Sequence, residues 1–503
     1  MVSKAMEQPA PPGLEPAEFR DKVLGLLFGA AIGDALGVLT EFETKEAAGG
    51  LVDLLPGKRL GFGGWPRSTR KGPNVPEGDW TDDTDQQAMI VQSLLANGGR
   101  PSPADFAARL RQWERKGFPE PPFNDTESLG IGFQTALVVR HAPPRPAHTP
   151  LLRPRPTERG ERLGRQRGVQ RGREQPLWPR FGAAAESHRA ESHRAPLQAA
   201  CSLPLFPLLA ERPPCALALL RACLQVSHPL FPSPDAEHHG MAALHWWLHP
   251  LTGGARSGSS NGAAMRTAIL GALRSHKGAA LAYSRTTHGS PHADATSLAV
   301  AEAVHALLRR GSDRKEAAAA AVEAAAAQLA ESVEALPPRV ASLLATYPGL
   351  PSDLADPNQI LAPANRADTI ATLAGVWEAR RGELAGEAEA GPAALRAGLS
   401  APALAGMGLA AEPIGCAVKT VGVGLWALRA GLDEGGGGAD GFRAVITAVT
   451  REGGDADTNA TVAGALMGAA LGLSNLPAEW VGGLLHGDWL RARGEELCDQ
   501  LLK

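Results

Sequence analysis

The sequence predicts an all-α fold, and three observations support this prediction. Ala and Leu dominate long stretches in which apolar residues recur at i, i+3 and i+4, the spacing of one helix face. Aromatic residues make up only 5% of the chain, and Tyr occurs only twice. No stretch alternates apolar and polar residues for long enough to indicate a sheet-dominated fold.

The first helix is expected over residues 19–39, and it is unusually rich in small residues. Within a helix each Gly costs roughly 1 kcal/mol relative to Ala. So many small residues therefore indicate that a neighbouring helix or a ligand approaches the backbone closely. The positions concerned are Gly25, Gly29, Ala30, Gly33, Ala35 and Gly37.

The same periodicity predicts the later helices. They are expected from about Thr84, over 103–116, over 315–345 as a long surface helix ending at Pro337-Pro338, and over 413–431, 441–450 and 460–472. Segments rich in Gly and Pro, at 44–79 and 380–412, are expected to be loops.

The segment 141–254 differs in composition from both flanks. It is crowded with Pro and Arg, contains no Lys, and includes the tandem repeat ESHRA-ESHRA. Such a segment cannot bury enough apolar surface to offset its ordering entropy. We interpret it as a long disordered insertion, with intron-derived sequence as the alternative. The expected organisation is a disordered N-terminus (1–18), one helical domain (19–140 and 255–500) and a Pro/Arg-rich low-complexity insertion (141–254).

Charge and composition exclude several classes of function. A formal net charge of -3 argues against an electrostatic nucleic-acid binder. The basic run within the insertion could contact nucleic acid, but such tracts are usually only solvated. We identify no 18-residue apolar run and no signal core in the first 20 residues, so no membrane association is expected. Five scattered cysteines favour a reducing compartment. We therefore expect an intracellular, cytoplasmic monomer, with an organelle as the alternative.

An acidic cluster marks the start of the second helix. Thr or one Asp there is a common N-cap, because its side-chain oxygen satisfies an unpaired N–H. Three acids within four residues exceed what a cap needs, and they repel one another unless a cation lies among them. The segment is Trp80-Thr81-Asp82-Asp83-Thr84-Asp85.

A second acidic cluster precedes the last Ala-rich helix. The Gly pair allows a tight turn, and Asp455, Asp457 and Thr458 offer three oxygen ligands on one side. Asp457 or Thr458 alone could be a simple cap. Oxygen ligands without a nearby Cys/His pair favour Mg²⁺ or Mn²⁺ over Zn²⁺.

Asp34 and Glu41 form a third acidic feature, at the end of the first helix. Asp34 stands among small apolar residues, where an unpaired charge is expensive, so we expect it to bond to backbone groups at a helix end. Glu41 lies past the helix end, within reach of a site.

Five segments occur in an order typical of one enzyme family: GAAIGDALGVLTEF, GDWTDDTDQQAMI, SSNGAAMRTAILG, SRTTHGSPHADA and GGDADTNATVAGALMGAALG. They resemble the ADP-ribosylglycohydrolases, which include the dinitrogenase-reductase-activating glycohydrolases and the ADP-ribosyl-acceptor hydrolases. The resemblance covers roughly 20–140 and 255–495. It implies an orthogonal helical bundle with two divalent cations, Mg²⁺ or Mn²⁺, in a central cleft.

The resemblance also implies roles for individual residues. The family's metal ligands match Glu41 (its mobile glutamate), Thr81, Asp82, Asp83, Asp455, Asp457 and Thr458, and the candidates for proton transfer are Glu41, Asp82 and Asp83. Its substrate-binding positions match Gly130, Gly132, Ser260, Asn261, Gly262, Ala263 and His288. An ordinary Asn-Gly turn and a structural histidine are the alternatives for the last five.

The implied activity is hydrolysis of an ADP-ribosyl glycosidic bond. Such a reaction develops oxocarbenium character and needs an activated water, which paired cations can supply. The expected partner is an ADP-ribosylated protein or a small ADP-ribose conjugate. Two alternatives stay open: a catalytically silent relative that binds ADP-ribose or has a structural role, and a di-metal phosphohydrolase. The second leaves the Ser260–Ala263 segment unexplained.

Overall fold

The structure is a computed structural model that describes residues 14–62, 76–118, 122–123, 131, 135, 260–288, 291–310, 313–346, 403–411, 413–433 and 437–503. Every regular element in these ranges is a helix, and the β contact found among them is an isolated bridge between Ser260 and Cys416. The predicted all-α fold is therefore confirmed.

The helices, in chain order, are α1 (Pro16–Gly37), the 3₁₀ turn η1 (Val38–Thr40), α2 (Lys45–Leu54), η2 (Pro56–Lys58), α3 (Asp82–Ala96), α4 (Pro103–Lys116), η6 (Ala264–Arg266), η7 (Ala268–Ala272), α11 (His276–Ser284), α12 (Pro291–Leu307), α13 (Arg314–Thr346), η9 (Leu404–Met407), α17 (Ala417–Asp433), α18 (Gly438–Glu452), α19 (Ala456–Leu471), η10 (Leu473–Asn475), α20 (Ala478–Gly483) and α21 (Gly487–Leu501). The predicted span of α4 is reproduced, whereas α1 begins at Pro16, inside the segment 1–18 that we expected to be disordered. Proline suits this first helical position because it needs no backbone donor.

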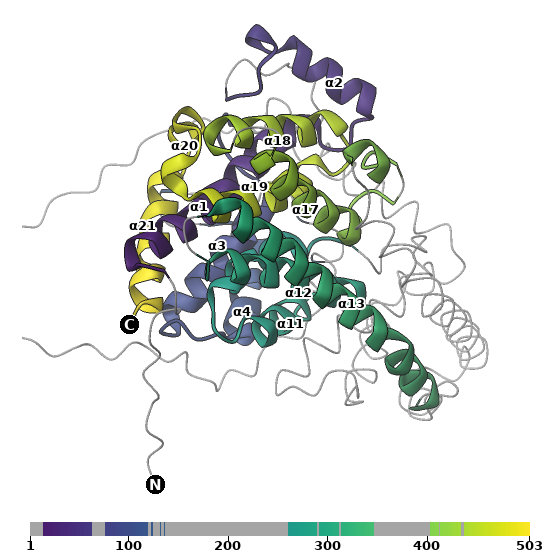
Figure 1. The fold of residues 1–503 in the computed structure, drawn as a ribbon. Coiled ribbons are helices and arrows are strands. Elements are labelled where there is room, and N and C mark those ends of the chain that lie inside the picture. The colour runs from purple at the N-terminus through teal and green to yellow at the C-terminus, as the bar shows by residue number, and fades with distance from the viewer. Residues whose placement is uncertain are drawn as a thin grey trace, which may run out of the picture. The chain divides into compact units, whose positions relative to one another are not determined.

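The small residues of α1 lie against α19, and the two helices run side by side (Figure 1). A Cβ added to Gly29 would collide with the main chain of Gly464, and one added to Gly33 would collide with Ala460. The collision is reciprocal, because a Cβ on Gly464 would meet the main chain of Gly29. The close approach predicted from the glycines is therefore made by a neighbouring helix. This contact joins the first and last parts of the domain.

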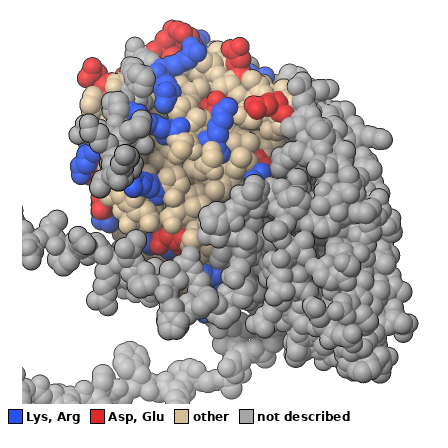
Figure 2. All heavy atoms as spheres, turned by 90° about the horizontal axis from the view of Figure 1, so that it is seen from below, with Lys and Arg blue, Asp and Glu red and all other residues tan. Residues whose placement is uncertain are grey.

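The remaining helices surround this central pair. α17 and α18 pack on α19, α21 packs on α1 and α3, and α12 contacts both α13 and α17. α13 buries a row of small residues and one Leu at helical spacing: Ala317, Ala318, Ala321, Ala325 and Leu329. The face of Figure 2 carries both basic and acidic side chains, interspersed among uncharged residues.

The predictions for α2 and α13 differ from the structure. α2 lies inside the segment predicted to be loop, because the Thr44 hydroxyl caps its first turn and Ala48 and Val52, four residues apart, are buried. The glycines of this segment had favoured a loop. α13 continues to Thr346, past the prolines at which we expected it to end. A proline removes one backbone donor, which a long helix anchored elsewhere by packing can tolerate.

The expectation of no membrane-length apolar run is wrong. Pro16–Thr40 has a window of mean hydropathy 1.9 and is long and apolar enough to cross a membrane, by length and composition alone. Leu, Val, Ile and Phe residues raise the mean hydropathy of this window, although small residues interrupt the bulky apolar ones. In the structure this window is wholly buried against other helices, as in the core helix of a soluble protein.

Several predictions fall on residues that the structure does not describe. These are the insertion over 141–254, Gly130 and Gly132, and most of the loop expected over 380–412. Among the described cysteines, Cys416 and Cys498 are free thiols, in keeping with the absence of a disulfide framework there.

Candidate metal centre

Asp34 anchors the start of α3. Its buried carboxylate accepts hydrogen bonds from the main-chain N–H and the hydroxyl of Thr81, at 3.1 and 2.8 Å. It also accepts from the N–H and the hydroxyl of Thr84, at 3.0 and 2.7 Å. The predicted bonding of Asp34 to backbone at a helix end is thus confirmed. The anchor fixes where the acidic segment of α3 begins.

The three aspartates that follow have different surroundings. Asp82 Oδ2 accepts from Gln86 Nε2 at 2.9 Å, one turn along α3. Asp85 accepts from the indole N–H of Trp80 at 2.9 Å and from that of Trp113 at 2.8 Å. Asp83 is 3% exposed, and its Oδ2 has no hydrogen-bond partner. Asp85 therefore has a structural environment, whereas Asp83 keeps an oxygen available for a ligand.

The second acidic segment is placed by a tight main-chain turn. Gly453 and Gly454 have φ of 69° and 66°, a region that only Gly enters without strain. The N–H of Gly454 donates to Glu43 O at 2.9 Å, and the N–H of Phe42 donates to Gly454 O at 2.5 Å. This pairing brings Glu41 alongside Asp455.

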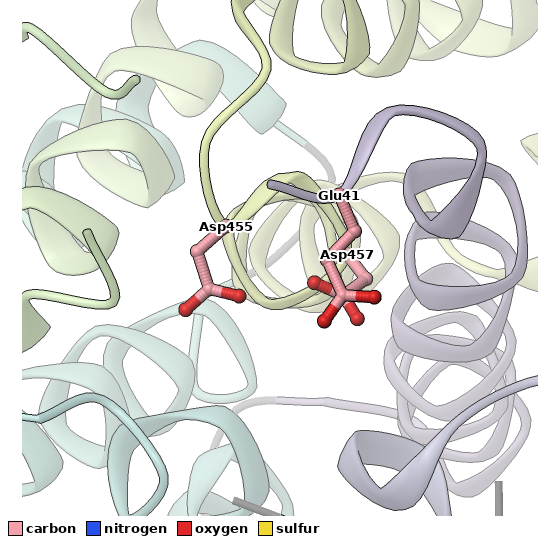
Figure 3. Close-up of side chains that lie close together, drawn as sticks. All are labelled: Glu41, Asp455 and Asp457. Carbon is pink, nitrogen blue, oxygen red and sulfur yellow. The ribbon is translucent and has the colours of Figure 1, made fainter. Parts of the chain in front are cut away.

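The carboxylates of Glu41, Asp455 and Asp457 come together as a result. Ligand oxygens of the three lie within 4.8 Å of one another, and all three residues are buried. Their carboxylates point to the same side of the start of α19 (Figure 3). Asp455 is the N-cap residue of α19, and Asp457 lies in its first turn. Residues more than 400 positions apart therefore share one buried acidic cluster.

The electrostatics connect this cluster with α3. The pKa of Asp83 is raised well above its usual range, first by burial and then by the charges of Asp34, Asp457, Asp82 and Asp455. Burial and the charge of Asp457 also raise the pKa of Asp34 to about 7. These carboxylates disfavour one another's ionisation, so bound positive charge would relieve the repulsion.

The donor set of the cluster fits a hard divalent cation. Its three carboxylates offer the oxygen donors that Mg²⁺ and Mn²⁺ prefer. Thr81 and Thr458, also expected as ligands, are buried at the starts of α3 and α19. The Thr81 hydroxyl donates its hydrogen to Asp34 and accepts the Asp83 N–H at 3.4 Å, which leaves one oxygen lone pair for another contact. Asp82 and Asp83 are not part of this three-residue group. The charges of Asp455 and Asp457 nevertheless raise the pKa of Asp83, so the start of α3 lies near the cluster.

The Ser260–Ala263 turn is tied directly to the acidic cluster. Asn261 Nδ2 donates to Asp455 Oδ2 at 2.7 Å and to Thr420 Oγ1 at 3.0 Å. Its main-chain N–H donates to Gly415 O at 2.9 Å. The Asn261 side chain, which we expected to bind substrate, is thus hydrogen-bonded to a carboxylate of the cluster. This bond depends on tertiary contacts that the local sequence does not reveal.

His288 lies beside the same turn. Its Nε2 is 3.0 Å from Ser260 Oγ, and its Nδ1 is 2.7 Å from Thr287 Oγ1. A Cβ added to Gly262 would lie 3.1 Å from His288 Cε1, so the ring and the turn are in close contact. The structure thus brings Ser260, Gly262 and His288 together.

The sequence is similar to one protein family and to two curated relatives. The family described as ADP-ribosylglycohydrolase matches residues 15–236 and 216–503 of the chain. The chain belongs to this family. An ADP-ribosylarginine hydrolase of Serratia proteamaculans is 33% identical over 134 residues, which cover 26% of this chain and 30% of that protein. An uncharacterized protein of Archaeoglobus fulgidus is 30% identical over 115 residues, 23% of this chain and 30% of that one.

A solved structure described as an ADP-ribosylglycohydrolase-related protein complex is also similar. It has 20% identity and a TM-score of 0.43, with 96% of this chain and 99% of that chain covered. The matches to the two curated relatives span only 30% of the length of each. Membership makes the chain a protein of the ADP-ribosylglycohydrolase family. The helices of its described residues give the all-α fold.

Proposed function

We propose that this protein hydrolyses an ADP-ribosyl glycosidic bond and releases ADP-ribose from a modified protein side chain or a small ADP-ribose conjugate. One observation carries the proposal: the buried carboxylates of Glu41, Asp455 and Asp457 converge within 4.8 Å. Family membership and the partial similarity to an ADP-ribosylarginine hydrolase support the substrate class.

In this proposal two divalent cations, Mg²⁺ or Mn²⁺, are held by Glu41, Thr81, Asp82, Asp83, Asp455, Asp457 and Thr458. When bound, they supply positive charge that orients ribose hydroxyls and lowers the pKa of an attacking water. The fit rests on the all-oxygen donor set and on the buried Asp83 oxygen that has no hydrogen-bond partner.

The chain's own residues divide the remaining work. Asp82 Oδ2 already accepts the amide of Gln86, which favours Glu41 or Asp83 for taking the proton from the attacking water. The Ser260–Ala263 turn holds the diphosphate. His288 lines the substrate cleft, and Gly130 and Gly132 lie beside the nucleoside. Attack of the water oxygen at the anomeric carbon then breaks the bond to the side chain or conjugate. The oxygen stays on ADP-ribose as the new hydroxyl, and the proton taken from the water passes to the released nitrogen or oxygen.

A catalytically silent ADP-ribose-binding relative is the second candidate. The presence of every expected acid in the two clusters argues for activity instead. The two candidates differ in turnover, while both bind ADP-ribose.

The test is release of free ADP-ribose in Mg²⁺ or Mn²⁺ from Arg-linked, Ser-linked and O-acetyl-linked substrates, each assayed separately. We expect release from at least one substrate and its loss in Asp455→Asn. Glu323→Gln, an exposed change on α13, is the matched control and should leave release unchanged. No release from any substrate, with ADP-ribose still bound, would support the silent relative. Full release by Asp455→Asn would remove the catalytic assignment.

A further inference from the structure

Arg266, the last residue of η6, is a buried cation with an unusual set of partners. It is 0% exposed, and its Nη1 donates to Gln86 Oε1 at 2.5 Å. Its Nη2 donates to Thr287 Oγ1 at 2.6 Å and to the main-chain oxygen of Tyr283 at 3.1 Å. These are all neutral acceptors. A buried charge without a directly bonded carboxylate is costly, so this arginine calls for an explanation beyond packing.

The Nη1 of Arg266 is connected through Gln86 to the acidic segment of α3. A guanidinium only donates hydrogen bonds, so the Gln86 amide must turn its oxygen toward Arg266. The amide nitrogen of Gln86 then faces Asp82 Oδ2, to which it donates at 2.9 Å. Arg266 therefore fixes the amide orientation that makes Gln86 a donor to Asp82. The opposite orientation would set two oxygens against each other.

The Nη2 of Arg266 is connected through Thr287 and His288 to the Ser260–Ala263 turn. Thr287 Oγ1 accepts from the guanidinium, so its hydroxyl hydrogen turns away from the cation and toward His288 Nδ1, at 2.7 Å. His288 then carries its proton on Nε2 and donates it to Ser260 Oγ at 3.0 Å. Arg266 thus favours one histidine tautomer, which is commonly set by the bond that the other ring nitrogen makes.

We propose that Arg266 is a positioning residue that holds a cation-binding carboxylate, Asp82, and the diphosphate-binding turn in a fixed relation through Gln86 and Thr287. This inference rests on the proposed function of the site. It assigns Arg266 no contact with substrate. The hydrogen bonds through Gln86 predict an effect on cation affinity. The hydrogen bonds through Thr287 predict a separate effect on ADP-ribose affinity.

The test uses the full chain and two binding measurements that need no turnover. Mn²⁺ affinity is measured by electron paramagnetic resonance, and ADP-ribose affinity by calorimetry at saturating Mn²⁺. Gln86→Leu should weaken Mn²⁺ binding about 10-fold, a typical effect of losing a residue that orients a metal ligand. Thr287→Val should weaken ADP-ribose binding about 10-fold and leave Mn²⁺ affinity unchanged.

Arg266→Met should weaken both affinities. Adding Gln86→Leu to Arg266→Met should then produce no further loss of Mn²⁺ affinity, because Gln86 no longer holds Asp82 once Arg266 is removed. Lys22→Met is the matched control. Lys22 is also buried and donates to main-chain oxygens, those of Leu307 and Arg310, so its loss should lower stability but not affinity.

The outcomes separate this inference from the proposed function. Additive losses in the double variant, or unchanged affinities in folded Arg266→Met, would overturn the positioning role. If Arg266→Met does not fold, Gln86→Leu and Thr287→Val decide, and unchanged affinities in both would overturn it. Wild-type protein that binds both ligands without hydrolysis would overturn only the proposed activity. Wild-type protein that binds neither would overturn both.

Discussion

The two acidic segments reach the same site by different physical means. The segment at the start of α3 is held by polar side chains: Asp34 bonds to Thr81 and Thr84, and two indoles bond to Asp85. The segment at the start of α19 is held mainly by main-chain contact, through the turn at Gly453 and Gly454 and the packing of α1 on α19. The first should be sensitive to loss of a polar group, and the second to an added methyl group.

The largest expected effect concerns Asp83 in the first segment. Asp83→Asn should lower turnover by about 10²–10⁴-fold, because an amide is a poor replacement for an ionised oxygen that contacts a cation or a proton. In urea without divalent cations, the variant should be at least as stable as the wild type, because it lacks a buried carboxylate that neighbouring carboxylates repel. Turnover close to wild type would contradict the distinct role of Asp83.

Asp85, two residues further along, should respond in the opposite way. Asp85→Asn places an NH₂ group against an indole N–H and leaves a buried donor without an acceptor. We expect a loss of about 1–3 kcal/mol in the free energy of unfolding, with turnover retained in the folded fraction. The urea midpoint and the rate of ADP-ribose release measure the two effects. Loss of turnover at unchanged stability would place Asp85 in the reaction instead.

An added methyl group tests the second segment. In Gly37→Ala the new Cβ would lie 2.5 Å from Ala456 O and from Asp457 Cα, so the start of α19 must shift. We expect about 1–3 kcal/mol of destabilisation and weaker Mn²⁺ binding. Gly50→Ala in α2 is the control, because its Cβ meets nothing within 4 Å. Equal Mn²⁺ affinity in both variants would show that main-chain packing does not place Asp457.

The remaining expected effect is a pH dependence that both segments share. Asp34 has a pKa of about 7 in the folded chain, above that of an unfolded Asp, so the folded state holds the proton more tightly. Its stabilising contribution is complete below about pH 4 and is lost as pH rises to about 7. Without cations, thermal stability should therefore fall between about pH 4 and about pH 7. Mn²⁺ should restore more stability at the higher pH, and equal restoration at both would contradict the coupling.

Sequence reasoning succeeded where a local pattern carries the structural cause. The i, i+4 glycines of α1 predicted close helix packing, and the isolated charge of Asp34 predicted a bond to a helix end. α2 was missed because the Gly- and Pro-rich composition of 44–79 favoured a loop and does not show the cap that Thr44 provides.

The division of labour among the acids could not be predicted from composition. Asp82, Asp83 and Asp85 look alike in sequence, and only the folded chain shows that Trp113 and Gln86 engage two of them. The same holds for Asn261, whose partner Asp455 is 194 positions away. Such pairings depend on which helices meet, and no local spacing encodes that.

The pairing of α1 with α19 also affects how the chain is made. The bond from the Thr40 hydroxyl to Thr450 O, close to that contact, spans 410 residues. At typical synthesis rates about 20 to 80 seconds separate the emergence of the two partners from the ribosome. During that interval the apolar helix α1 lacks α19, the helix that later packs against it. We therefore expect the nascent protein to depend on chaperones, and a message truncated before α19 to yield aggregated protein.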